Sequence, residues 1–244
     1  MPRTIKTWRD PYGEGFSTCR RREIAMNPGL TVLVGCNGAG KTTMLNNIEA
    51  VLKKEKIPCK SYNALVEGTN SIGSMFFNEE MELAAGLMTA SEGEAQNINI
   101  GIFSAGLREF IRTGKYNSGR KEDRLAEIFM SEERKKAENE RPVPKERWIL
   151  LDASTSGVSI DSILEIKGLI SLMKEDAESM GIELYVIVAT NEYEMANGEE
   201  CLDVMTGCYK TFKTYNSYRK FILKSREQKN RRTEKANAKK RDGK

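Results

Sequence analysis

A glycine-rich segment near the N-terminus has the residue types and the spacing of a phosphate-binding loop. Residues 30–44 read L-T-V-L-V-G-C-N-G-A-G-K-T-T-M, so an apolar run enters G-x-x-x-x-G-K-T and a helical pattern follows. Glycines let successive backbone N–H groups face phosphate oxygens, and the helix adds the positive end of its dipole. In such a loop Lys41 reaches the β- and γ-phosphates, and the Thr42 hydroxyl ligates Mg²⁺. The complete spacing favours this interpretation over a chance glycine turn.

A second apolar run supplies the carboxylate that such a site needs. Residues 148–152 read W-I-L-L-D, and loop-forming residues follow Asp152. Phosphate-binding loops work with an aspartate of this kind on the Mg²⁺ side of the site. Asp152 could instead cap the next helix, but the upstream motif favours the metal role. We therefore predict Thr42 and Asp152 as the metal ligands.

Strand-like and helix-like segments alternate along the chain, which is typical of an α/β fold with a mostly parallel sheet. The patterns predict strands at 4–8, 17–26, 30–34, 58–66, 148–152 and 182–190, and a small hairpin over 201–213. Helices are expected at 41–54, 74–90, 98–111 and 160–179, and from about Tyr215 onward. In the helix over 160–179, we expect Ile160, Ile163, Leu164, Ile170 and Met173 to face inward.

The composition excludes several classes of protein. The 244 residues include no histidine, which removes His-based zinc sites and His-based acid–base catalysis. The five cysteines form no C-x-x-C pair, so the chain shows no disulfide framework. No run is apolar and long enough to span a bilayer, and the first residues lack a signal-peptide core, so we expect a cytoplasmic protein without membrane insertion.

Charge is distributed unevenly. Residues 215–244 contain twelve Lys or Arg and three Asp or Glu, a net charge of +9, whereas the whole chain carries +4. A basic, disordered tail is therefore expected at 226–244. Residues 114–147 are mostly charged and end near Pro142 and Pro144, which predicts an exposed helical insertion that could bind a protein partner.

The chain resembles the ABC-type ATPases, a class that includes transporter nucleotide-binding domains and the heads of the SMC, Rad50 and RecF group. The resemblance rests on G-C-N-G-A-G-K-T-T, on S-E-G-E at 91–94, and on W-I-L-L-D-A-S-T-S-G-V-S. It implies a P-loop NTPase of this type over 1–225, with an N-terminal antiparallel strand layer and a small helical subdomain at about 74–112. It also implies a head-to-tail homodimer, in which Ser91 and Gly93 of one subunit cap the ATP held by the other. The residues implied to bind ATP are Gly35, Asn37, Gly38, Ala39, Gly40, Lys41, Thr42, Thr43, Ser91 and Gly93. A competing signature turn is Ser104-Ala105-Gly106.

Several positions depart from that family's pattern. Ala153 stands where a glutamate usually polarises the attacking water, and Asn191 stands where a switch histidine is expected. Neither side chain can act as a base near neutral pH. Asn191 remains a candidate catalytic residue beside Lys41, because its amide can hydrogen-bond a γ-phosphate. Ser159 replaces a further aspartate, Asp161 and Glu192 are nearby carboxylates, and Asn70 or Asn78 could substitute for the usual glutamine. We expect tight Mg-ATP binding with slow hydrolysis.

Three functions fit these features. The first is a nucleic-acid-associated ATPase, because the tail carries phosphate-binding side chains such as Arg219, Lys220, Arg226, Lys229, Arg231 and Arg232. The second is a transporter nucleotide-binding subunit. The third is a regulatory ATP switch that binds a protein partner. The whole chain is also similar to small, stand-alone ABC-type ATPases of phages and prophages, which implies a host-cytoplasmic location.

Overall fold

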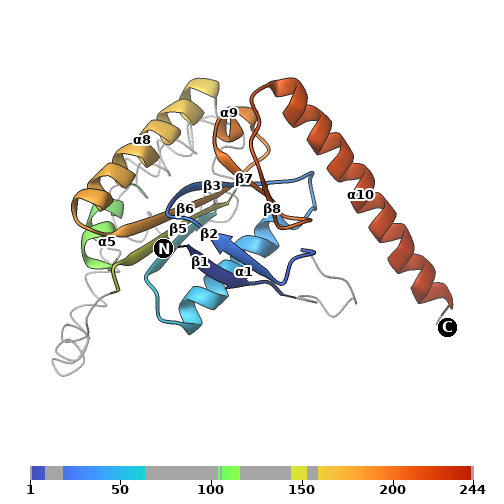
Figure 1. The fold of residues 1–244 in the computed structure, drawn as a ribbon, viewed down its shortest axis with the longest axis horizontal. Helices are drawn as coiled ribbons and strands as arrows, with labels where there is room; N and C mark the ends of the chain where they lie inside the picture. The colour runs from blue at the N-terminus through green and yellow to red at the C-terminus, as the bar shows by residue number, and fades with distance from the viewer. Residues whose placement is uncertain are drawn as a thin grey trace, which may run out of the picture.

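The computed structural model describes residues 2–8, 19–63, 104, 106–115, 144–152 and 159–242. The elements in chain order are β1 (Arg3–Lys6), β2 (Glu23–Met26), β3 (Gly29–Val34), α1 (Lys41–Lys54), β4 (Cys59–Asn63), α5 (Leu107–Thr113), β5 (Glu146–Asp152), α8 (Ile160–Ser179), β6 (Glu183–Ala189), α9 (Tyr193–Ala196), β7 (Glu200–Asp203), β8 (Cys208–Lys210) and α10 (Tyr215–Asp242). Figure 1 shows their arrangement.

A six-stranded sheet in the order β4-β5-β6-β3-β7-β8 organises the molecule. All its pairings are parallel except that of β7 with the short strand β8. The register places Asp152 opposite both Asn63 and Ala189, so three strands end at the same edge. The predicted mostly parallel α/β fold is confirmed. In such folds, ligands bind at the edge of the sheet where the carboxyl ends of the strands lie.

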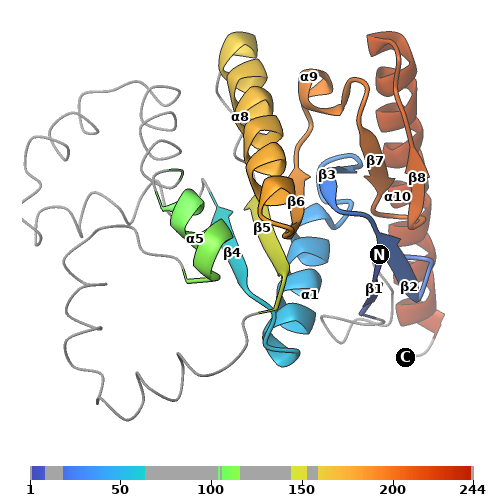
Figure 2. The same ribbon diagram turned by 60° about the vertical axis from the view of Figure 1, so that its left-hand side comes forward.

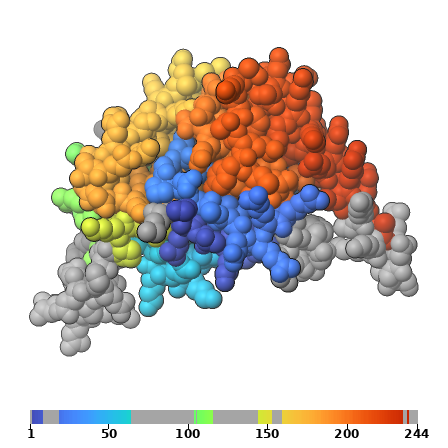
Figure 3. Space-filling view, in the orientation of Figure 1, coloured from blue at the N-terminus to red at the C-terminus, as the bar shows by residue number. Residues whose placement is uncertain are grey.

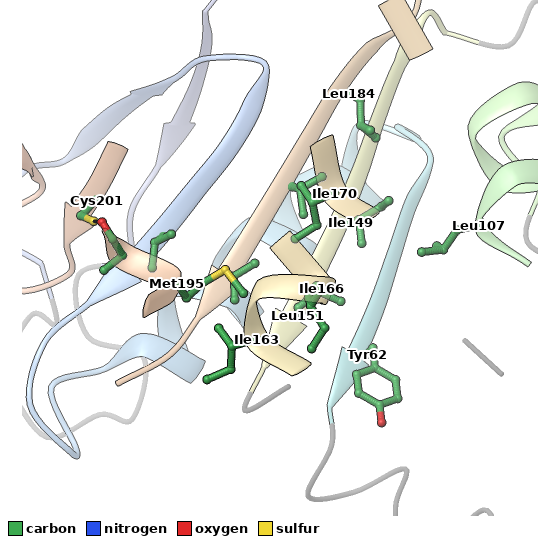
Figure 4. Close-up of a cluster of buried hydrophobic side chains, with 14 of the residues drawn as sticks. Tyr62, Leu107, Ile149, Leu151, Ile163, Ile166, Ile170, Leu184, Met195 and Cys201 are labelled. Atoms are coloured by element: carbon green, nitrogen blue, oxygen red, sulfur yellow. Dashed lines mark hydrogen bonds between the residues drawn. The ribbon is translucent and has the colours of Figure 1, made fainter. Parts of the chain in front are cut away.

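Successive side chains of each strand point to opposite faces of the sheet, so the strands contribute to two separate hydrophobic cores. On one face, Ile149 and Leu151 pack with Ile163, Ile166 and Ile170 of α8 (Figure 4). On the other face, Trp148 and Leu150 pack with α1 through its residues Met44, Leu45, Ile48 and Leu52. Figure 2 shows α8 and α1 on opposite sides of the sheet. Strands buried on both faces explain the nearly continuous apolar runs in the sequence.

A two-stranded antiparallel sheet of β1 and β2 forms the expected N-terminal layer. It lies over α1, where the side chain of buried Asn47 accepts the Trp8 N–H at 2.7 Å and donates to the Lys6 carbonyl at 2.9 Å. The layer therefore helps to fix the helix that follows the glycine-rich loop. The strand predicted over 17–26 is shorter in the structure. β2 begins at Glu23, and Arg20, Arg21 and Arg22 are exposed and lie outside any strand.

Two further expectations differ from the structure. Ile160 and Leu164 are 58% and 51% exposed, because α8 turns Ile163, Ile166 and Ile170 toward the sheet instead. Residues 226–242 are helical and continue α10, whereas a disordered tail was expected. The tail is rich in Lys, Arg, Glu and Gln, which favour helix, and contacts described below hold it against the body. Among the described helices, none combines the length and apolar character needed to cross a bilayer.

Candidate functional site

Strand β3 leads directly into the glycine-rich loop at the carboxyl edge of the sheet. Gly38 and Gly40 have φ values of 71° and 101°, a backbone region that disfavours residues with a Cβ. At Gly35 the limit is space, because an added Cβ would lie 3.0 Å from the Ala39 Cβ and 3.2 Å from Val204 Cγ2. These glycines are required for the conformation that lets loop amides face an anion.

The start of α1 is suited to bind phosphate. Among the described residues, no side chain makes a capping hydrogen bond there, and Gly40 occupies the N-cap position. The first-turn N–H groups of a helix have no intrahelical acceptors, so those of Lys41 and Thr42 can serve a ligand. The Thr42 side chain is exposed, which leaves its hydroxyl accessible to a metal ion, whereas Thr43 is buried.

Lys41 is held in place by backbone and side-chain oxygens. Its Nζ donates to the Gly35 carbonyl at 2.8 Å and to Asn191 Oδ1 at 2.7 Å. Burial lowers the pKa of Lys41, an effect that the negative charge of Asp152 partly opposes. The Asn191 amide in turn donates to Asn37 Oδ1 at 2.6 Å. The three predicted residues Asn37, Lys41 and Asn191 thus form one hydrogen-bonded group across the loop.

Asp152 ends β5 beside the loop and is half-buried. Asn63 ends the neighbouring strand β4 in register with Asp152, and its amide lies 3.4 Å from Asp152 Oδ2. Both line a small polar cavity of roughly 130 Å³ between α1, β4 and β5, together with Asn46, Glu49 and Ser61. Carboxylate and hydroxyl oxygens are ligands that Mg²⁺ accepts, so the side chains of Asp152 and Thr42 fit that ion.

Sequence reasoning missed Asn63. Its signal is positional, because it is the last residue of the strand that pairs with the aspartate-bearing strand. That signal was not readable without the strand order, since β4 and β5 are 83 residues apart in the chain.

Other sequence-predicted positions are distributed differently. Ser91, Gly93, Asn70, Asn78 and Ala153 lie outside the described residues. Gly106 is the N-cap of α5, and Ser104 lies two residues before it. Ser159 caps α8, because its Oγ accepts the Ser162 N–H at 3.2 Å. This structural role accounts for a serine at that position.

The two nearby carboxylates differ in their surroundings. Asp161 is exposed in the first turn of α8. Glu192 follows Asn191 and is partly buried, and burial raises its pKa, with a further contribution from the charge of Glu194. A carboxyl with a raised pKa is better matched to accept a proton near neutral pH than an ordinary one.

A parallel sheet that delivers a glycine-rich loop, a lysine and a threonine to a helix N-terminus, beside a strand ending in aspartate, defines a P-loop NTPase. The comparison with protein families agrees: the AAA domain family AAA_23 matches residues 12–242. The chain therefore belongs to this AAA domain family of P-loop ATPases.

Two archaeal proteins are similar to this chain. Both carry the name "Putative ABC transporter ATP-binding protein", one from Pyrococcus furiosus and one from Pyrococcus horikoshii. Each is 24% identical over 217 residues, which covers 77% of this chain and 77% of the relative. These matches support the ABC-type character that the glycine-rich loop and the strand around Asp152 indicate.

Proposed function

We propose that the protein binds Mg-ATP at the glycine-rich loop and acts as an ATP-dependent switch with slow hydrolysis. The observation that carries this proposal is the hydrogen bond between Lys41 and Asn191 at 2.7 Å. It joins the phosphate-binding lysine to the end of β6, where a γ-phosphate sensor would lie. Bound ATP would compete for Lys41 and so alter the position of Asn191.

Slow turnover follows from the side chains available for catalysis. Asn191 is an amide and Ala153 lacks a polar group, so neither can take a proton from water. Lys41, Mg²⁺ and the loop amides supply electrostatic stabilisation, which is the larger part of phosphoryl-transfer catalysis. Glu192, with its raised pKa, is the carboxylate best suited to support residual hydrolysis. Binding and slow cleavage are the expected outcome.

The proposal includes a head-to-tail homodimer in which Ser91 and Gly93 cap the partner's ATP. The experiment is size-exclusion chromatography with light scattering, with and without Mg-ATP, combined with an ATPase assay. Wild-type protein should shift from monomer to dimer with Mg-ATP. The Lys41→Ala variant, which loses the phosphate contact, should remain monomeric. A wild-type protein that stays monomeric with every nucleotide contradicts the dimer.

A nucleic-acid-associated role, like that of the SMC and Rad50 group or of small phage ATPases, is the process we favour, in a cytoplasmic setting. It is supported by the basic residues exposed along α10, which include Arg219, Lys220, Lys224, Arg226 and Arg231. Although Glu227 and Glu234 are also exposed on α10, basic side chains outnumber them, and such a helix can neutralise the phosphates of DNA or RNA.

Two other roles have narrower support. The names of the archaeal relatives favour a transporter nucleotide-binding subunit, which would act as a separate chain beside a membrane permease. The charged insertion at 114–147 favours a protein-binding regulatory switch. Co-purification with a permease would support the first, and loss of a protein partner on deleting 116–143 would support the second.

A further inference from the structure

The last helix makes a buried contact with the glycine-rich loop. Ser225 of α10 is only 3% exposed. Its Oγ accepts the backbone N–H of Cys36 at 3.1 Å and lies 3.4 Å from Met205 Sδ, toward which it can donate. Ser225 is therefore the acceptor for an amide inside the phosphate-binding motif, supplied from 189 residues further along the chain.

One helical turn later, Lys229 reaches the same loop. Its Nζ donates to the Asn37 carbonyl at 3.0 Å. A Cβ added at Gly38 would lie 2.5 Å from this nitrogen, so the ammonium group is also close to the Gly38 backbone. Lys229 thus binds the loop through its backbone, from a position 192 residues further along the chain.

Other contacts fix α10 against the body, so these two side chains are presented at a defined position. Near its start, the buried Tyr218 packs against Phe212 and Tyr193, with ring centroids 5.2 and 5.8 Å apart. Tyr193 begins α9, two residues after Asn191. Farther along α10, Arg232 donates to the Met205 carbonyl at 3.3 Å. Figure 1 shows α10 passing beside the β7–β8 hairpin, and Figure 3 shows this region as one continuous surface with the N-terminal residues.

We propose that Ser225 and Lys229 are positioning residues of the phosphate-binding loop, which makes α10 part of the nucleotide site. A loop containing several glycines loses much conformational entropy when it is ordered. Contacts that order the loop before nucleotide arrives reduce that cost and so raise the affinity. The proposal rests on nucleotide binding by this loop. Because the two residues contact the loop and not the nucleotide, they should affect ATP and ADP equally.

The test compares Ser225→Ala and Lys229→Met with Lys224→Met, a matched control that removes an exposed ammonium group from the same helix. Dissociation constants for fluorescent Mg-ATP and Mg-ADP analogues are measured for each variant, together with thermal unfolding without nucleotide. Loss of one such hydrogen bond should weaken both nucleotides by the same factor, about three- to tenfold. Lys224→Met should stay within about twofold of wild type, and Lys229→Arg should recover most of the affinity.

The outcomes separate the possible roles of these residues. Equal losses for ATP and ADP in both variants, with wild-type affinity in Lys224→Met, support positioning. A loss confined to ATP for Lys229→Met would show that Lys229 contacts the γ-phosphate, which overturns its assignment as a positioning residue. Unchanged affinities in both variants overturn the proposal altogether.

The positioning role of Ser225 can also be tested without nucleotide, and therefore independently of the proposed function. Hydrogen exchange followed by mass spectrometry reports on the Cys36 amide, which Ser225 protects. In Ser225→Ala, exchange of the peptide covering the loop should be faster by about tenfold than in wild type, while the β6 peptide is unchanged. Failure of wild-type protein to bind any nucleotide would refute the proposed function. Unchanged loop exchange in Ser225→Ala would refute the positioning role.

Discussion

The ammonium group of Lys41, at the start of α1, and the side-chain oxygen of Asn191, just after β6, lie 2.7 Å apart. Asn191 also donates to Asn37 Oδ1, so its amide orientation is determined by both partners. An amide can accept from the lysine and donate to the loop at once, which neither a carboxylate nor an aliphatic side chain can do. Asparagine at this position therefore connects Lys41 to the glycine-rich loop by hydrogen bonds without adding a charge.

Asn191→Asp should weaken Mg-ATP binding by at least about tenfold, because the new carboxylate would pair with Lys41 and repel the γ-phosphate. Asn191→Ala removes the hydrogen bonds without adding charge and should change the affinity by only about threefold. Isothermal titration calorimetry with Mg-ATP measures both. Equal affinities for the Asp and Ala variants would show that Asn191 does not face the γ-phosphate.

Asp152→Asn should remove most of the Mg²⁺ dependence of nucleotide binding. In wild-type protein, EDTA should weaken ATP binding by about tenfold or more, because the ion bridges the protein and the phosphates. The Asn variant should bind ATP with similar affinity in Mg²⁺ and in EDTA, and should show no hydrolysis. Asn63→Ala, which leaves the carboxylate in place, is the control. A variant that retains the full Mg²⁺ effect would place the metal ligand elsewhere.

Nucleic-acid binding by α10 is best tested by substitution, because deleting residues 226–244 would also remove Lys229 and Arg232 from their contacts. Replacing the exposed residues Arg219, Lys220 and Arg226 with Gln should weaken DNA or RNA binding. It should also reduce the slope of log affinity against log salt by about two to three.

The matched control replaces three exposed lysines outside α10, which are Lys6, Lys54 and Lys174. This control lowers the net charge equally but should leave the salt slope within about one of wild type. Fluorescence anisotropy at several salt concentrations measures both. Equal slopes for the two triple variants would exclude a specific nucleic-acid role for α10.

The raised pKa of Glu192 predicts a pH-dependent stability effect. Its carboxyl holds the proton more tightly in the folded state, so its stabilising contribution is complete below the unfolded pKa and is lost as pH rises through the folded pKa. The Gln side chain does not ionise, so Glu192→Gln avoids this loss. Its stability relative to wild type should therefore be greater at pH 7 than at pH 4. Thermal unfolding at both values measures the gain. The gain should be smaller in a Glu194→Gln background, because Glu194 contributes to the shift.

Arg147 should be important for stability. It is 3% exposed and donates to the carbonyls of Phe110, Ile111, Pro144 and Glu146, which ties the end of α5 to β5. Arg147→Ala would remove all these hydrogen bonds and should cost about 3 kcal/mol in the free energy of unfolding. Arg112→Ala, on the exposed side of α5, should cost less than about 0.5 kcal/mol. Urea unfolding of both variants provides the comparison.

The sequence predicted the central sheet well, because each parallel strand is buried on both faces and reads as an uninterrupted apolar run. The bounds of α1 and α8 were also predictable from caps and periodicity. The inward face of α8 was harder to assign. Ile160 and Leu164 satisfy the helical period as well as Ile163 does, and only the direction of the helix over the sheet decides which of them are buried.

The candidate site was predictable where its residues lie in one motif or at the ends of apolar strands. The contacts of Asn63, Ser225 and Lys229 with the site were not predicted, because they depend on which strands are neighbours and on where the last helix packs. The sequence had instead suggested nucleic acid as the partner of Lys229. A basic sequence such as 226–242 has no apolar stripe that would indicate docking. Its contacts with the body are made by polar and charged side chains, which leave no periodic signal.

The position of α10 also has a consequence for how nucleotide could be released. If the docking of α10 on the loop strengthens nucleotide binding, then nucleotide binding must strengthen the docking of α10 by the same free energy. A partner that pulls α10 away from Cys36 and Asn37 would then lower nucleotide affinity without touching the nucleotide. Such a partner would act as a nucleotide exchange factor that works by displacing α10.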